Sequence, residues 1–342
     1  MSALRPLPTW PVHDLVQHLR ARGVDIPDTA CATALVGGVS GAVLRLEAGG
    51  TSVVVKQALP ELAVPGVWRA DPRRLLTEAA ALRVLHTLAP EHVPEVLDLD
   101  EGRLLLTMAA APADWTTWKQ LLLSGVDLTR DATLAEALGR TMRAWHDATR
   151  ADSWSGALGP REDFAPTNDF VDLRLDPFYG HVARALGGHV GSALTRLADG
   201  LLASQQTLVH GDVSPKNILT AGDPAAWWLV DSECAVLSDP VFDVAFALAH
   251  LLLKSVDQSR SHAADAAARL WTAYAAGAAP FSEQHLSEHT AALVLARVAG
   301  VSQVDYLTDS ERTAVREIAV ATVLGPTTIT DLAETIRARE AA

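Results

Sequence analysis

The chain has 342 residues, of which 49% are hydrophobic and 20% charged, and its formal net charge is −13. This length exceeds what one hydrophobic core usually serves, so we expect two lobes. The acidic balance argues against a nucleic-acid-binding protein, which needs a basic face. No apolar run is long enough to cross a bilayer, because the longest candidate, around 241–253, contains Asp243 and His250. The absence of a signal segment and the presence of only two cysteines predict a reduced, cytoplasmic location.

The first hundred residues predict about five strands with one helix inserted among them, after a short amphipathic helix. Gly49 and Gly50 predict the hairpin turn between two of the strands. Leucines and alanines at helical spacing predict the inserted helix. The helices are expected at 13–22 and 72–88, and the strands at 32–57, 93–99 and 103–108.

The character of the sequence changes after Met108. The small, proline-containing stretch 109–118 predicts a hinge, and the chain beyond it is mostly helical. We expect a long helix at 134–148, a polar loop at 160–176, and short strands at 207–209, 218–220 and 227–230. The prediction is therefore an α+β fold of two lobes. The N-terminal lobe, 1–108, holds the antiparallel sheet and its helix, and a larger, mainly helical lobe occupies 119–342.

The strongest chemical signal is the stretch LVHGDVSPKNIL at 208–219. An apolar strand leads to Asp212, Asn217 follows five residues later, and another apolar strand ends at Asp231. Phosphoryl transfer needs a carboxylate that orients the attacking hydroxyl and accepts its proton, together with oxygen ligands for Mg²⁺. An Asp and an Asn on one tight loop, with a second Asp after a neighbouring strand, can converge on one point. The alternative is that both aspartates are turn or cap residues.

A second signal lies in the predicted N-terminal sheet. Lys56 interrupts the apolar strand SVVVKQA, where an unpaired ammonium is costly to bury. Glu78, on the following helix, is its natural partner, and the pair could hold nucleotide phosphates. The alternative is an edge-strand lysine that points into water. Upstream, LVGGVSGAVL places Gly38, Ser40 and Gly41 in a turn whose backbone N–H groups can approach phosphates.

This order of glycine turn, strand lysine, helix glutamate, His-Gly-Asp-x-x-x-x-Asn and later aspartate resembles the aminoglycoside phosphotransferase family. The segment SDPVFDVAFAL at 238–248 resembles a helix start of the same family. The resemblance extends from about residue 32 to the last helices and implies a protein-kinase-like fold. It also implies ATP or GTP bound between the lobes, with the base near Met108, two Mg²⁺ ions as cofactors, and a small hydroxylated acceptor.

The same resemblance implies a role for each matching residue. Asp212 is the base, and Asn217 and Asp231 bind Mg²⁺. Lys56 and Glu78 hold the nucleotide phosphates. The expected structural supports of the loop are His210 and Asp243.

Two stretches are similar to the methylthioribose kinase branch of this family, Lys-Gln-Ala-Leu-Pro at 56–60 and ARVAGVSQVDYL at 296–307. That branch carries two adjacent arginines for the sugar, where this chain has Ala296 and Arg297. It also typically has Ser where this chain has Asn217. These departures favour a different, sugar-like acceptor.

Lys216 could reach the transferred phosphate as a point charge. Four further residues with polar side chains near the motifs above could bind the acceptor. The acceptor candidates are Arg174, Asp176, Glu233 and Arg297.

The sequence favours antibiotic O-phosphorylation as the function and leaves two alternatives open. The acidic residues of 160–176 suit a cationic acceptor, which favours O-phosphorylation of an aminoglycoside or nucleoside antibiotic. Arg297 and the 56–60 stretch favour a metabolic sugar kinase of the methylthioribose type. A non-catalytic, nucleotide-binding pseudokinase is the alternative from another class, and the intact motif set argues against it. We expect no nucleic-acid or membrane partner, and the sequence specifies no oligomeric state.

Overall fold

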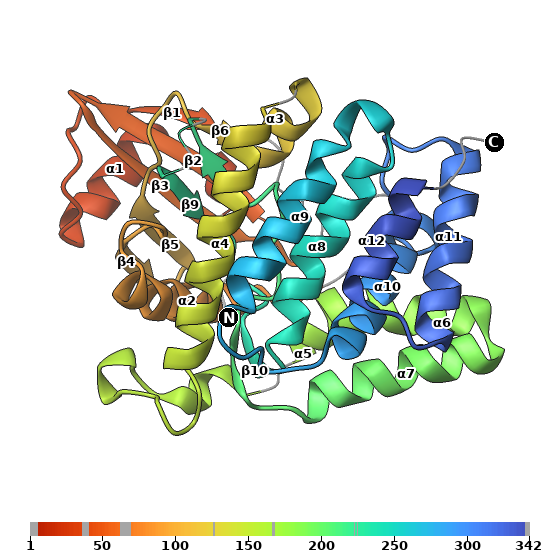
Figure 1. Ribbon diagram of the computed structural model, residues 1–342. Helices are drawn as coiled ribbons and strands as arrows, with labels where there is room; N and C mark the ends of the chain where they lie inside the picture. The colour runs from red at the N-terminus through yellow and green to blue at the C-terminus, as the bar shows by residue number, and fades with distance from the viewer. Residues whose placement is uncertain are drawn as a thin grey trace. The chain divides into compact units, whose positions relative to one another are not determined.

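The computed structural model describes residues 6–35, 41–61, 70–125, 127–165, 168–221, 223 and 225–338. The chain forms two compact units (Figure 1). The first comprises Met1–Ala113 together with the short segment Val230–Glu233, and the second comprises Asp114–Leu229 and Cys234–Ala342. The boundary after Ala113 falls inside the stretch for which we expect a hinge.

The first unit is built on an antiparallel sheet. Its strands lie in the order β1-β2-β3-β5-β4, and α2 follows β3 in the chain, so the predicted N-terminal sheet with an inserted helix is confirmed. The elements are η1 (Leu7–Thr9), α1 (Val12–Ala21), β1 (Cys31–Ala34), β2 (Gly41–Ala48), β3 (Thr51–Ala58), α2 (Arg74–Leu88), β4 (Val96–Asp100) and β5 (Leu105–Ala109). Gly49 and Gly50 form the β2–β3 turn with φ of +57° and +86°, a conformation that glycine adopts without strain.

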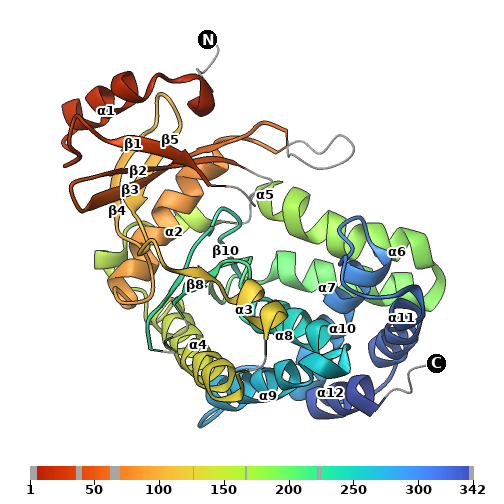
Figure 2. The same cartoon turned by 90° about the horizontal axis from the view of Figure 1, so that it is seen from above.

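Successive side chains of β3 point to opposite faces of the sheet, and the two faces have different partners. Val53 and Val55 are fully buried in a core with Leu15 of α1, so α1 covers one face of the sheet (Figure 2). Because side chains alternate along a strand, Lys56 points to the other face, where it meets Glu78 of α2. The pattern of the strand therefore delivers a buried lysine to a carboxylate on the neighbouring helix.

The second unit is mainly helical, as predicted, and its centre is α8 (Val241–Ser255). Residues 241–249 are all buried, and α8 packs against α9 (His262–Tyr274) and α10 (Glu283–Ala299). The other helical elements are α3 (Trp118–Ser124), α4 (Leu128–Ala148), η2 (Gly156–Leu158), η3 (Arg161–Phe164), α5 (Asn168–Phe170), η4 (Val171–Gly180), α6 (His181–Leu186), α7 (Gly188–Ala203), η5 (Gln258–Arg260), α11 (Asp309–Leu324) and α12 (Ile329–Ala338).

Short strands frame the loop that carries the main motif. They are β6 (Thr116–Thr117), β7 (Thr207–Val209), β8 (Ile218–Thr220), β9 (Trp227–Leu229) and β10 (Val236–Ser238). β7 pairs with β10, and β8 pairs with β6 and β9. The strands β7, β8 and β9 occur where the sequence predicts them, whereas β6 and β10 are too short to predict.

The polar loop predicted at 160–176 is wrong in its second half. Residues Val171–Gly180 form η4, a π-helix with Pro177 inside it, and Leu173 and Leu175 are buried. Pro177 has no backbone N–H and therefore removes one hydrogen bond from this helix. Because of its charged residues and its proline, this element could not be predicted from the sequence.

No described helix combines the length and apolar character needed to span a membrane.

The pH dependence of stability is expected to depend on His289 in α10. Burial lowers the pKa of His289 from 6.5 to about 3, and its Nδ1 lies 2.9 Å from the Tyr179 hydroxyl. Because the unfolded chain takes up this proton near pH 6.5 and the folded chain does not, the free energy of unfolding falls as the pH drops below 6.5. Between about pH 7.5 and about pH 5, this proton uptake lowers the free energy of unfolding of the wild type by roughly 2 kcal/mol. We expect His289→Gln to lack this decrease.

Chemical denaturation of the wild type and of His289→Gln across this pH range measures the effect. His189→Gln, on the exposed part of α7, is the matched control. Parallel pH curves for wild type and His289→Gln would contradict the assignment.

Candidate active site

In the second unit, the loop after β7 is fixed by a buried aspartate. Asp243, at the first turn of α8, accepts hydrogen bonds from the backbone N–H groups of His210 at 2.7 Å and Gly211 at 2.9 Å. The Nε2 atom of His146 lies 3.2 Å from the same carboxylate. A carboxylate at this place stabilises both the helix N-terminus and the loop. Asp243 and His210 thus lie where loop-supporting residues are expected.

Gly211 allows the loop to pass close to the following segment. Its φ is +80°, and a Cβ atom at this position would lie 2.4 Å from the backbone oxygen of Cys234. We expect Gly211→Ala to lower the free energy of unfolding by roughly 2–4 kcal/mol, from left-handed strain plus the steric clash.

Gly277→Ala separates these two causes. Gly277 has φ of +89°, but a Cβ atom there would meet no other atom within 4 Å, so its replacement should cost only about 1–2 kcal/mol. Equal losses in thermal or chemical denaturation of the two variants would show that the close approach at Gly211 is absent.

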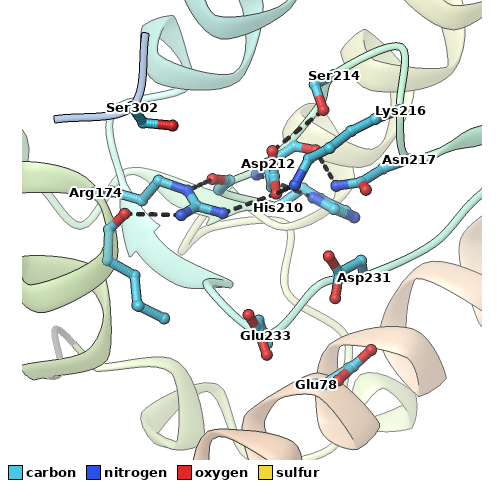
Figure 3. A network of polar contacts seen from close by, with 12 residues as sticks. Glu78, Arg174, His210, Asp212, Ser214, Lys216, Asn217, Asp231, Glu233 and Ser302 are labelled. Atoms are coloured by element: carbon cyan, nitrogen blue, oxygen red, sulfur yellow. Dashed lines mark hydrogen bonds and ion pairs between the residues drawn. The ribbon is translucent and has the colours of Figure 1, made fainter. Parts of the chain in front are cut away.

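Asp212, which is 2% exposed, lies at the centre of a polar network (Figure 3). Its Oδ2 atom is 2.8 Å from Arg174 Nη2 and 3.0 Å from Lys216 Nζ. Ser214 Oγ donates to Oδ1 at 3.3 Å. The Asn217 amide donates to the backbone oxygen of Asp212 at 3.0 Å. This bond fixes which end of the Asn217 side chain is the donor and leaves its Oδ1 atom as the group that could bind a cation.

Arg174 holds this loop from η4. Its Nε donates to Gly211 O at 2.6 Å and its Nη1 to Leu173 O at 2.7 Å, in addition to the ion pair with Asp212. A planar guanidinium can make these contacts at once, which an ammonium cannot. The structure therefore brings Arg174 to the proposed base.

Asp176, the acceptor candidate two residues further along η4, is not part of this network. It is exposed and pairs with Arg184 at 2.7 Å. Arg297, on α10, is half-buried, and the side chains that affect its pKa include Asp212 and Arg174. Two of the sequence candidates of this unit, Arg174 and Arg297, thus lie near Asp212.

In the first unit, Lys56 lies among three carboxylates. Its Nζ atom is 2.9 Å from Glu78 Oε1 and 3.9 Å from Glu233 Oε2, and it donates to Asp231 Oδ1. Burial lowers the pKa of Lys56, but Asp231, Glu78 and Glu233 outweigh it, so the pKa is raised well above its usual value. Lys56 is thus charged, and the contact with Glu78 expected from the sequence is present.

The carboxylates of this cluster fit a hard cation. One oxygen from each of Glu78, Asp231 and Glu233 lies within 4.8 Å of the other two, and Figure 3 shows the three side chains. Carboxylate oxygens are the ligands that Mg²⁺ prefers. Burial raises the pKa of Glu78 to about 7, so added positive charge would favour its ionised form. Asp231 has φ of +72°, an uncommon conformation for a residue with a side chain.

Arg74, the residue that holds Glu233, was not predicted from the sequence. Arg74 is fully buried on α2, and its Nε donates to Glu233 Oε2 at 3.1 Å. Its guanidinium also donates to the backbone oxygens of Leu59 and Asp71. Glu233, an acceptor candidate from the sequence, is therefore engaged in a buried ion pair. The spacing of Arg74 four residues before Glu78, on one helix face, is the signal that could have revealed it.

The remaining nucleotide-binding candidates lie around the sheet. Gly38 and Ser40 fall outside the described residues. Gly41 begins β2, and a Cβ atom there would meet Gln57 O at 3.1 Å and Lys56 Cε at 3.2 Å, so a side chain would crowd Lys56. Met108 lies within β5, between β3 and β4.

A model of the phosphotransferase enzyme family matches residues 31–281, which contain both clusters. The chain belongs to this family.

Three known proteins are similar to this chain. The methylthioribose kinase of Pectobacterium carotovorum is 26% identical over 274 residues, which cover 72% of this chain and 66% of that kinase. The solved structure of an amicoumacin kinase with AMP-PNP, Ca²⁺ and its ligand has a TM-score of 0.55 at 12% identity and covers 95% of this chain and 97% of that one. A type VIII aminoglycoside-3'-phosphotransferase has a TM-score of 0.50 at 19% identity, with coverages of 83% and 97%.

These relatives support the fold more broadly than the activity. The structural neighbours share the fold of this phosphotransferase-family chain at low identity, which confirms the predicted kinase-like architecture. The matches to the curated methylthioribose kinases span between about half and two thirds of those proteins' lengths.

Proposed function

We propose that this chain is a small-molecule kinase that transfers the terminal phosphoryl group of a nucleoside triphosphate to a hydroxyl of a sugar-containing acceptor. The observation that carries this proposal is Asp212, held on a fixed loop with Asn217 bonded to its backbone. The family match and the methylthioribose kinase relatives support the reaction class.

The residues of this chain suggest how each part of the reaction is served. Asp212 orients the acceptor hydroxyl and accepts its proton as the new O–P bond forms and the β–γ bridging bond breaks. Arg174 and Lys216 fix the direction of the Asp212 carboxylate. Lys56 binds nucleotide phosphates. Positioning and charge supply most of the rate in such reactions.

Divalent cations are part of the proposal. Asp231, in the carboxylate cluster of the first unit, and Asn217, on the Asp212 loop of the second, are each proposed as a ligand of Mg²⁺, which neutralises charge on the triphosphate. The amicoumacin kinase structure, which contains AMP-PNP and Ca²⁺, supports a nucleotide with a divalent cation, and we take ATP as the first co-substrate to test, with GTP as the alternative. The two cysteines of the chain, Cys31 and Cys234, are too few for a disulfide framework, which fits the cytoplasmic location that we expect.

For the acceptor, we favour a metabolic sugar over an aminoglycoside. The groups around Asp212 include Arg174 and Lys216, which disfavour a polycationic substrate. The exposed Asp176, which favoured a cationic acceptor in the sequence, pairs with Arg184 instead. Antibiotic O-phosphorylation is the second candidate, to be tested in the same assay.

A coupled assay of ADP or GDP release, with Mg²⁺ and separate pools of free sugars, nucleoside antibiotics and aminoglycosides, tests the proposal. We expect acceptor-dependent release with a sugar pool. Release with antibiotics alone would favour the resistance function. Nucleotide binding without acceptor-dependent release in any pool would favour the pseudokinase.

A further inference from the structure

Lysine is rare in this chain, and its distribution is uneven. Lysine occurs four times in 342 residues, at positions 56, 119, 216 and 254, although this residue type is normally spread over protein surfaces. Lys56 belongs to the carboxylate cluster of the first unit. The other three lie in the second unit, close enough to His250 of α8 to affect its pKa.

Lys254, on the last turn of α8, is a buried cation. It is 1% exposed, and its Nζ donates to the backbone oxygen of His250 at 3.2 Å. Its Nζ also lies 5.5 Å from the ring centre of Tyr306. Among the described residues, no carboxylate lies within ion-pair distance of Lys254. Burial, followed by the neighbouring cations, lowers its pKa to about 7. A buried ammonium without a counter-ion is unfavourable unless an anion binds it.

Two further polar groups beside Lys254 lack partners. The buried Nε of Arg297 and the buried hydroxyl of Tyr306 have no hydrogen-bond partner among the described residues. Arg297 uses its Nη1 atom to donate to Ser302. The guanidinium carbon of Arg260 lies 5.5 Å from the centre of the Tyr306 ring. Unsatisfied buried donors are uncommon in native proteins and call for a ligand or water.

These basic side chains extend to the loop that carries the proposed base, Asp212. Lys216 pairs with Asp212 at 3.0 Å, and the backbone N–H of Lys119 donates to Pro215 O at 2.8 Å in the same loop. Burial lowers the pKa of Arg297, and Arg174 lowers it further, while Asp212 raises it.

Six basic side chains gather in this group. They are Lys119, Arg174, Lys216, Lys254, Arg260 and Arg297, and the carboxylates that interact with them include Asp212, Asp257 and Asp305. In a chain of net charge −13, such a gathering of basic side chains marks a place that attracts anions.

We propose that the acceptor is an anion, a sugar or polyol that carries a carboxylate or phosphate group, bound by Lys254, Arg297 and the Tyr306 hydroxyl while a free hydroxyl faces Asp212. Lys216, next to Asn217, can serve the transferred phosphate. Lys254 and Arg297 lie on α8 and α10, which carry no proposed nucleotide-binding residue, so they remain for the acceptor. This inference rests on the proposed function, because it names the substrate class of the same site.

The reaction balances for such an acceptor. Its hydroxyl oxygen bonds to the terminal phosphorus of the nucleotide, the β–γ bridging P–O bond breaks, and the hydroxyl proton passes to Asp212. The anionic group of the acceptor is unchanged and serves only for binding.

Kinetics with three acceptors that share one sugar test the inference. Ribose is neutral, ribonate carries a carboxylate and ribose 5-phosphate carries a phosphate. We expect kcat/KM for one of the two anions to exceed that for ribose at least about 10-fold, as one charge-assisted contact contributes. In Lys254→Met this preference should be lost through a rise in KM with little change in kcat. Arg316→Met, on the exposed face of α11, is the matched control.

Calorimetric binding of the same three sugars to the Asp212→Asn variant separates this inference from the proposed function. Binding of an anion that Lys254→Met abolishes, without product from the wild type, would support the anion site and contradict the kinase. Turnover of ribose at least as efficient as that of both anions would keep the kinase and overturn the anion site. Failure of both anions to bind would also overturn it.

A stability measurement guards against misfolding of the variant. Because Lys254 is a buried cation without a counter-ion, Lys254→Met should raise Tm, as replacement of a residue kept for binding often does. A lower Tm would contradict the inference, because it would mean that Lys254 serves the stability of the fold instead of a ligand.

Discussion

Replacement of Asp212 by asparagine is expected to lower kcat roughly 10²- to 10⁴-fold, the usual contribution of a positioned general base. Asparagine keeps the size of the side chain, and the loop remains tied to Asp243 through His210 and Gly211. The variant should therefore still bind nucleotide. Steady-state kinetics together with a nucleotide-binding titration measure the two effects separately.

Asp199→Asn is the matched control, since Asp199 is exposed on α7 and its replacement removes the same charge from the same unit. A wild-type kcat for Asp212→Asn would exclude Asp212 as the base. Loss of nucleotide binding in the same variant would mean that the substitution disturbs more than the proton transfer.

Replacement of Lys56 by methionine is expected to reduce both activity and stability. The ammonium is 7% exposed and compensates Glu78 and Asp231. Removal of one partner from a buried ion pair typically costs about 3–5 kcal/mol, because the remaining charge is left uncompensated. We expect a loss of this order in chemical denaturation, and a raised nucleotide Kd because the phosphates lose their cation.

Glu78→Gln in the Lys56→Met background is the informative companion. It removes one of the uncompensated carboxylates, so the double variant should be more stable than Lys56→Met alone, and the double-mutant cycle gives the coupling energy. Additive effects of the two substitutions would contradict the buried contact at 2.9 Å.

Local sequence signals predicted most of the fold and part of the site. The alternation around Lys56 and the helical spacing around Glu78 are short-range patterns, and both elements form where they are expected. The stretch 208–219 likewise predicted its own loop, because strand, turn and amide lie within one short segment.

Contacts between distant segments could not be predicted. Arg174 contacts Asp212 only because η4 is helical. Pro177 within η4 led to the prediction of a loop at this place. The basic group near Lys254 is assembled from residues between 119 and 297, so no window of the sequence contains it. Arg74 meets Glu233 across 159 positions.

The most direct test of the proposed kinase activity is the mass of the acceptor after incubation with the purified protein, ATP and Mg²⁺. We expect an acceptor one phosphoryl group heavier, formed in equal amount with ADP, and formed at least about 100-fold more slowly when Asp212 is replaced by asparagine. Nucleotide binding with no phosphorylated acceptor among neutral sugars, anionic sugars and antibiotics, or a product that forms equally well with the Asp212→Asn variant, would contradict it.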